Sequence, residues 1–268
     1  MKSKRVALPY VIWSLLFILG PILITLFYAF GQDQVTLDNI RKAFSGEYFA
    51  IFLRSILTAL IVTGICLLLG YPAAYTVSRM KAQTARLVIV LMVLPMWINF
   101  LLRTYAWRML LDDNGIINQL LMAIGIPGQQ LLYTQGAVIM GLTYDFLPFM
   151  ILPIYTALQK IGGSLLEASS DLGANRIKTF TRVIFPLSLP GIITGIVMVF
   201  MPAITTFVVT ELLGGGKYNM YGDLITEQFL QTRDWNFGSA LAVVMFLLMA
   251  VSMVIIRRID KDGEGYVL

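Results

Sequence analysis

The chain has 268 residues, of which 58% are hydrophobic and only 13% are charged, and it carries a net charge of +5. A soluble domain carries about 25% charged residues, so the composition excludes a soluble globular protein and indicates a membrane protein with several spans. The sequence has no histidine, which excludes a histidine metal site and a Ser-His-Asp triad, and its single cysteine, Cys66, excludes an internal disulfide. We attribute the basic balance to membrane orientation rather than to nucleic-acid binding.

Six apolar runs are long enough to cross a bilayer, which takes about 20 helical residues. The first run is longer than a signal-peptide core and lacks a small-residue cleavage site, so we expect a retained helix. The pattern predicts an all-α membrane protein with six transmembrane helices and a single domain over residues 1–268. The runs are Val6–Phe30, Ile51–Val77, Leu87–Leu111, Thr134–Leu158, Leu189–Thr210 and Phe237–Ile256.

Basic residues are distributed unevenly between the loops. If the N-terminus is cytoplasmic, the inner segments hold 13 of the 20 Lys and Arg residues, and the positive-inside rule therefore places both termini in the cytoplasm. The same distribution places the polar segment after the fourth span on the cytoplasmic side. The inner basic residues are Lys2, Lys4, Arg5, Arg79, Lys81, Arg86, Lys160, Arg176, Lys178, Arg182, Arg257, Arg258 and Lys261.

Three outer segments carry local sequence patterns. Thr36–Ala50 predicts an amphipathic surface helix capped by Thr36. Turn signals follow at Asn114-Gly115 and Pro127-Gly128. The run Gly214–Lys217 superficially looks like a phosphate loop, but it lacks the earlier glycine and the following Ser or Thr of that motif. No nucleotide-binding motif is visible, so any ATP must be bound by another subunit.

The polar segment between the fourth and fifth spans has a helix–turn–helix pattern. Ser164 and Glu167 have capping-box spacing and predict the start of one helix, and Gly173 suits the left-handed residue that follows it. Asn175 predicts the cap of a second helix, which Pro186 would end. Each helix is too short to be stable alone in water. The segment is therefore either a membrane-surface loop or a docking element for a cytoplasmic partner.

Within this segment the residues match a known motif. Glu167-Ala168-Ser169, Gly173 and Val183–Pro186 resemble the EAA loop of ABC importer permeases, E-A-A-x3-G-x9-I-x-L-P, with mild departures at Ser169, Val183 and Phe185. The resemblance implies a type I importer permease of the MetI-like fold, whose loop at about 160–188 docks on an ATPase subunit. It implies an ATPase-coupling role for Glu167, Ala168, Ser169, Asp171, Gly173 and Pro186.

The resemblance extends along nearly the whole chain. Leu69–Tyr75, Leu94–Trp107, Leu147–Leu158 and Arg233–Ala240 are similar to the spermidine/putrescine importer permeases, in particular those of the PotB type. This implies polyamine uptake across the bacterial inner membrane by a chain that binds no cofactor and catalyses no bond chemistry. The implied partners are a second permease, an ATPase dimer that binds ATP and Mg²⁺, and an extracellular substrate-binding protein. Permeases for iron, thiosulfate or phosphonate, and ion-coupled secondary transporters, are the alternatives.

A polyamine path needs carboxylates to offset ammonium charge and aromatic faces for cation–π contacts. Asp145 is expected near the bilayer midplane, where a carboxylate indicates function, or else it pairs with Arg103 or Arg108. Tyr105 and Trp107 belong either to the path or to an interfacial aromatic belt, and Glu211 contacts either substrate or the binding protein. The predicted path residues are Trp97, Asn99, Tyr105, Trp107, Tyr144, Asp145 and Glu211.

Overall fold

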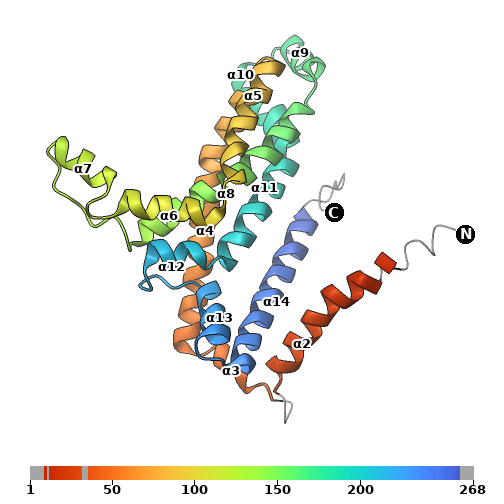
Figure 1. Ribbon diagram of the computed structural model, residues 1–268. Helices are drawn as coiled ribbons and strands as arrows, with labels where there is room; N and C mark the ends of the chain where they lie inside the picture. Colours follow the sequence, from red (N-terminus) through yellow and green to blue (C-terminus); the bar gives the residue numbers. More distant parts are fainter. Residues whose placement is uncertain (1–8, 11, 32–35, 260–268) are drawn as a thin grey trace, which may run out of the picture.

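The computed structural model describes residues 9–10, 12–31 and 36–259, and every regular element in these ranges is a helix (Figure 1). The expected all-α class is confirmed. The longer helices are α2 Gly20–Ala29, α4 Gly46–Ser78, α5 Ala82–Val93, α6 Phe100–Leu111, α8 Gln135–Gln159, α11 Phe185–Thr205, α13 Tyr221–Leu230 and α14 Trp235–Ile259. The shorter ones are η1 Leu15–Leu19, α3 Asp38–Ala43, η2 Leu94–Trp97, α7 Ile116–Ala123, α9 Gly163–Asp171, α10 Arg176–Thr179, η3 Phe180–Ile184 and α12 Val208–Gly214.

Among the described residues, five helical segments are long and apolar enough to cross a membrane, and a sixth crossing results if one bent pair forms a single span. This agrees with the predicted six-span layout. The beginning of the first predicted span at Val6 lies outside the described residues, as do Lys2, Lys4, Arg5 and Lys261. The five unbroken segments are Ile12–Ala29, Gly46–Ser78, Gln135–Gln159, Arg176–Thr205 and Trp235–Val254.

The prediction of the third span as one continuous helix is wrong. Ala82–Trp97 and Phe100–Ala123 are separate segments with a bend of 89° between them. Pro95 lies in the first turn of η2, and the Asn99 side chain caps α6. Proline removes a backbone donor, and asparagine is a favoured residue at a helix start, so together they break the helix. Apolar residues continue on both sides of the break, so the apolar run alone does not reveal it.

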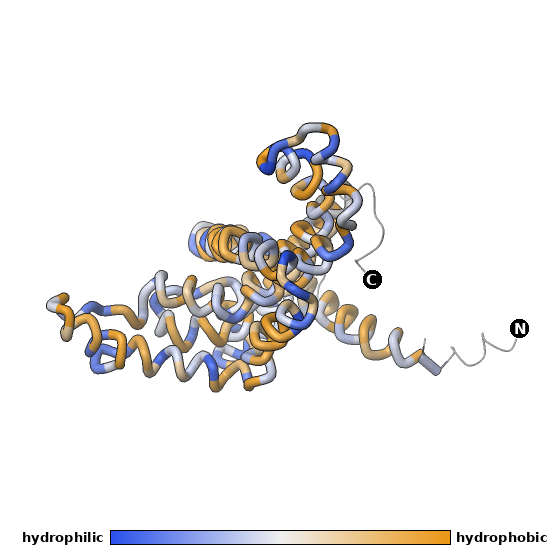
Figure 2. Tube along the Cα trace, turned by 90° about the horizontal axis from the view of Figure 1, so that it is seen from above, coloured by the Kyte–Doolittle hydropathy of each residue, from blue (hydrophilic) through white to orange (hydrophobic). Residues whose placement is uncertain are grey.

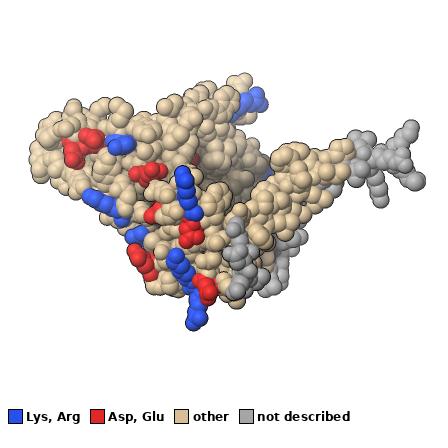
Figure 3. Space-filling model, turned by 60° about the horizontal axis from the view of Figure 1, so that its bottom comes forward, with Lys and Arg blue, Asp and Glu red and all other residues tan. Residues whose placement is uncertain are grey.

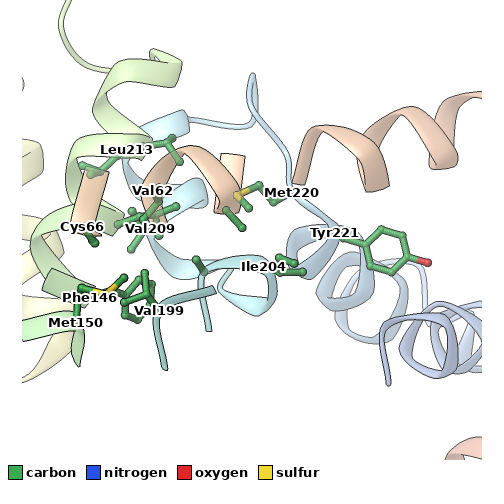
Figure 4. Close-up of a cluster of buried hydrophobic side chains, with 14 of the residues drawn as sticks. Val62, Cys66, Phe146, Met150, Val199, Ile204, Val209, Leu213, Met220 and Tyr221 are labelled. Carbon is green, nitrogen blue, oxygen red and sulfur yellow. The ribbon is translucent and has the colours of Figure 1, made fainter. Parts of the chain in front are cut away.

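The centre of the molecule is a packed group of three helices, α4, α8 and α11. Small residues allow the helices to approach closely: a side-chain carbon added at Gly191 would lie 2.6 Å from the carbonyl oxygen of Pro153. Figure 4 shows Cys66 of α4, Met150 of α8 and Val199 of α11 in one apolar cluster. Cys66 is completely buried there, in agreement with a packing role. Close packing of this kind is the main force that holds membrane helices together.

The helices α2 and α14 lie side by side at the edge of this core. Figure 2 colours α2 as mostly hydrophobic, and its Leu23 and Phe27 side chains are exposed. Figure 3 shows charged side chains of both signs over the end of the molecule that carries α3 and α13, whereas the protruding α2 bears none. A helix with outward apolar side chains and no charge is suited to contact with lipid.

The predicted surface helix after the first span is present but begins later than expected. The helix α3 follows Leu37, and no side chain caps it. The backbone N–H of Thr36 donates to the carbonyl oxygen of Phe30 at 2.8 Å. The prediction of a Thr36 cap is therefore wrong, because this residue lies one position before the helix cap and is bonded to the end of the preceding helix.

Candidate functional site

The segment with the EAA-like motif forms a helical hairpin of α9 and α10 that projects from one end of the molecule (Figure 1). We call residues 162–186 the coupling hairpin. Its first helix begins after Gly162, which has no side chain to cap it. The predicted capping box at Ser164 is therefore wrong: Ser164 lies within the first turn, beyond the cap position from which a hydroxyl satisfies the free N–H groups.

The turn of the coupling hairpin agrees with the prediction. Gly173 has φ of +74°, in the left-handed region that glycine adopts without steric cost. The backbone N–H of Ala174 donates to the carbonyl oxygen of Ser169, which closes the end of α9. Asn175 then caps α10, since its side chain accepts a hydrogen bond from the N–H of Lys178 at 2.9 Å. The predicted glycine turn and asparagine cap are both confirmed.

The residues expected to couple to an ATPase are not equally accessible. Glu167, Ala168, Asp171 and Gly173 are exposed, as a contact surface requires. Ser169 is buried, and its hydroxyl oxygen lies 2.9 Å from that of Thr179, which ties α9 to α10. The structure thus places Ser169 inside the hairpin rather than on its outer surface.

Two large apolar residues on the hairpin are strongly exposed. Leu172 is 88% exposed and Ile177 is 73% exposed. Leu172 directly follows α9, which carries the exposed Glu167, and Ile177 lies in α10 on the other side of the Gly173 turn. Such side chains are suited to a hydrophobic cleft in another protein. The sequence indicates this exposure, because each helix is too short to bury all of its apolar residues within the hairpin.

Pro186 does not end the second helix, and that prediction is wrong. The backbone continues helically from α10 through the π-helical turn η3 into α11, so that residues 176–205 form one span. In η3 the N–H of Phe185 donates to the carbonyl oxygen of Phe180, five residues earlier. This wider turn comes immediately before Pro186, which lies in the first turn of α11. We attribute the continuity to this turn, because a proline ring crowds the preceding turn of a regular helix.

The coupling hairpin is also connected to the core by aromatic contacts. The Phe180 ring lies edge-on to Tyr71 at 6.0 Å and to Tyr75 at 5.7 Å between ring centroids. The Tyr71 hydroxyl lies 3.0 Å from the hydroxyl of Ser188 on α11. The coupling hairpin is therefore linked through Phe180 and Tyr71 to both α4 and α11.

The predicted path residues divide into separate groups. Trp97 is 87% exposed and lies immediately before the break between η2 and α6. The Asn99 side chain accepts a hydrogen bond from the N–H of Leu101 at 2.9 Å, so its oxygen already has a structural partner. Tyr105 is exposed on α6, two positions along the helix from Arg103. Residues at that spacing do not share a helix face.

Asp145, Tyr144 and Trp107 do come together, on the facing sides of α6 and α8. An Asp145 carboxylate oxygen lies 3.4 Å from a guanidinium nitrogen of Arg103. The Tyr144 and Trp107 rings meet edge to face at 5.3 Å between centroids. Arg108, the other predicted partner of Asp145, instead donates to the Tyr133 hydroxyl at 3.1 Å. The structure thus contains the pairing with Arg103, in a cluster with two of the predicted path aromatics.

Glu211 is exposed, but it does not directly follow the fifth span, as the predicted span end at Thr210 implied. The span ends at Thr205, and Thr206 is extended with ψ of 143°. Glu211 lies on α12, a separate short helix that contacts α6, α8 and α13. The predicted end of the span at Thr210 is wrong. Consecutive threonines favour extended backbone because of their branched side chains, a signal that hydrophobicity does not record.

A polar cluster that the sequence reasoning missed joins α12, α13 and α4. The Asp223 carboxylate accepts hydrogen bonds from the Thr210 hydroxyl and the Met220 N–H, both at 2.6 Å. The Arg54 guanidinium donates to the Asn219 carbonyl at 2.7 Å. Burial raises the pKa of Asp223 to about 6, against the lowering effect of its hydrogen bonds. The sequence feature that could have indicated this cluster is Asp223 itself, an acidic residue in the first turn of a helix.

Comparison with known proteins identifies close relatives. The chain is 40% identical over 262 residues to the spermidine/putrescine transport system permease protein PotB of Haemophilus influenzae, covering 93% of this chain and 91% of the relative. It is 37% identical over 235 residues to the protein of the same name from Escherichia coli, covering 87% of this chain and 86% of the relative.

Solved structures support the fold. A bacterial ABC transporter that imports the acidic polysaccharide alginate contains a chain that matches with a TM-score of 0.78 at 23% identity, covering 97% of this chain and 96% of that one. Residues 66–262 match the model of the family described as the binding-protein-dependent transport system inner membrane component. The expected importer-permease fold is confirmed, and the chain belongs to the family of binding-protein-dependent transport system inner membrane components.

Proposed function

We propose that this chain is a permease subunit of an ATP-driven importer of polyamines such as spermidine and putrescine. The observation that carries the proposal is the 40% identity to PotB of Haemophilus influenzae over nearly the whole chain. The carboxylate and aromatic rings of Asp145, Tyr144 and Trp107 supply groups that suit a chain of ammonium charges. The chain itself carries out no bond chemistry in this proposal.

In the proposed assembly this chain contacts three protein partners and the lipid bilayer. A second permease forms a heterodimer with this chain, and an ATPase dimer holding ATP and Mg²⁺ docks on the coupling hairpin. An extracellular substrate-binding protein delivers the polyamine to the opposite end, and lipid surrounds the rest. The single domain of residues 1–268 lies in the bacterial inner membrane with both termini in the cytoplasm, in keeping with its basic residues.

The mechanism that we propose is alternating access driven through the coupling hairpin. Closure of the ATPase dimer pushes the exposed surface around Glu167 and Leu172. The push reaches α11 along the unbroken helix of residues 176–205 and reaches α4 through Phe180. Packed helices shift as rigid bodies rather than deform, so the movement appears at the far end of the core. Hydrolysis then resets the complex.

The turn at Gly173 provides one test of this coupling. Gly173→Val is expected to reduce uptake several-fold, because a branched residue in the left-handed region costs about 1–2 kcal/mol and displaces Glu167 from its partner. No atom lies within 4 Å of the added carbon, so the effect comes from the backbone alone. Gly173→Asn is the matched control, since asparagine tolerates this conformation. Equal loss in both variants, measured as uptake rate per assembled complex, would contradict the role of the turn.

Substrate class is tested by uptake assays. Cells without polyamine uptake of their own would express this chain with the second permease, ATPase and binding protein encoded by the same genome. We expect uptake of radiolabelled spermidine or putrescine that requires ATP, and no uptake of thiosulfate or a phosphonate. Preferred uptake of an anion would refute the proposal. Omission of the ATPase is the control for passive entry.

A further inference from the structure

Arg103 occupies the kind of environment that would receive a substrate ammonium group. Its guanidinium carbon lies 5.9 Å from the centroid of the Tyr144 ring and 6.0 Å from that of Phe100. On another side it is 3.4 Å from the Asp145 carboxylate. A carboxylate combined with aromatic rings is the common recognition site for organic cations. The Arg103 guanidinium thus occupies a site of the kind that binds organic cations.

The pairing between Arg103 and Asp145 is incomplete. Their side chains are only 10% and 4% exposed, yet the separation of 3.4 Å exceeds that of a good charge-assisted hydrogen bond, about 2.7–2.9 Å. The Asp145 oxygen that faces Arg103 and the Nε of Arg103 are buried without a hydrogen-bond partner among the described residues. Buried polar groups are normally satisfied. A carboxylate held in this way neutralises the arginine but retains capacity for a better donor.

The two partners are on elements that can move relative to each other. Asp145 lies in the middle of α8, within the packed core of α4, α8 and α11. Arg103 lies one turn into α6, immediately after the 89° break, and α6 contacts α8 at few positions compared with the core helices. A rotation of α6 about the break would withdraw the guanidinium and shift α6 against α12, on which it also packs, while α4, α8 and α11 keep their contacts with one another. The break therefore gives the ion pair a means of opening.

We infer that Arg103 is an internal substitute for the substrate, and that a primary ammonium group of a linear polyamine displaces it from Asp145 during transport. The ammonium is compact and has three donors, whereas the guanidinium is planar with five donors, and its Nε is left without a partner here. Arg103 keeps Asp145 neutralised between cycles, which a carboxylate at membrane depth requires. This inference rests on the proposed polyamine function and identifies the group that recognises the charge.

The test measures spermidine binding to the complex of both permeases and the ATPase in lipid nanodiscs, without the binding protein. Asp145→Asn is expected to weaken binding about tenfold or more, the effect of losing one charge-assisted hydrogen bond. Arg103→Gln removes the competitor and is expected to tighten binding by a similar factor. Asp113→Asn, in an exposed loop, is the matched control for loss of a carboxylate.

The double variant Arg103→Gln/Asp145→Asn distinguishes this inference from a purely structural ion pair. If Arg103 is a competitor, the double variant binds spermidine as weakly as Asp145→Asn alone. If the pair only stabilises the fold, removal of both charges restores binding and uptake to the wild-type level, which overturns the inference. Weaker binding in Arg103→Gln also overturns it. A wild-type complex that takes up no polyamine would instead refute the proposed function, and the inference with it.

Discussion

Replacement of Glu167 by lysine is expected to reduce ATP-driven uptake to the background level while the chain still inserts and assembles in the membrane. Glu167 is exposed on α9, and its side chain makes no hydrogen bond or ion pair with the described part of the chain. Its substitution therefore leaves the folding of the hairpin unaffected. At a docking surface, by contrast, a reversed charge faces partner groups selected for the opposite sign, which costs several kcal/mol.

The measurement compares uptake, ATP hydrolysis and the amount of ATPase that copurifies with the membrane subunits. Glu167→Lys should lose all three, because the ATPase no longer docks. Asp113→Lys is the matched control, since Asp113 is equally exposed but lies in the loop between α6 and α7. Normal uptake by Glu167→Lys would show that the coupling hairpin does not contact the ATPase through this residue. Loss of the chain from the membrane would show instead that the residue has a structural role.

Gly191→Leu is expected to prevent correct packing of the three-helix core. A side-chain carbon at this position would lie 2.6 Å from both the Pro153 oxygen and the Ala157 side chain, and 3.1 Å from the Ile154 backbone. Backbone atoms cannot move aside as a flexible side chain can, so α8 and α11 must separate. Overpacking of a core costs about 1–3 kcal/mol, and a leucine against backbone on a helix interface is expected at or above the upper end of that range.

The control for this variant is Gly64→Leu. Gly64 lies on the outer side of α4, and a carbon added there has no atom within 4 Å. Both substitutions add the same apolar side chain to a membrane helix, so insertion and helix propensity change alike. Thermal unfolding of the detergent-solubilised protein should show a lower midpoint for Gly191→Leu only. Equal midpoints would mean that α8 and α11 do not pack at Gly191.

Long apolar helices were predictable from the sequence because membrane insertion depends mainly on hydrophobicity and length. The second, fourth and sixth spans agree with the predicted positions, within several residues at their ends. The breaks were not predictable in this way. The bend before α6 depends on Pro95 and Asn99, and the end of α11 depends on the backbone preference of Thr205 and Thr206. Such local effects leave the hydrophobic pattern unchanged.

In the candidate site, motif spacing predicted the glycine turn and asparagine cap of the coupling hairpin, since both are properties of single residues and their neighbours. The outcome at Pro186 was not predictable, because it depends on the wider helical turn formed just before it. The contact between Arg103 and Asp145 was one of two alternatives, and only the orientation of α6 relative to α8 selects between them. Sequence spacing within one helix says nothing about the rotation of another.

The break between η2 and α6 also determines which surface of the chain meets water. Lipid supplies no hydrogen-bond partners, so a non-helical backbone at membrane depth is tolerated only where protein covers it or water fills the adjoining space. With the bent pair as one span, the side of the molecule at Ile98 and Asn99, with the exposed Trp97 ring, faces a hydrated or protein-lined region. The opposite requirement applies to α2, whose uninterrupted backbone and apolar side chains can lie in hydrocarbon. Two surfaces that both expose large apolar side chains thus meet different surroundings.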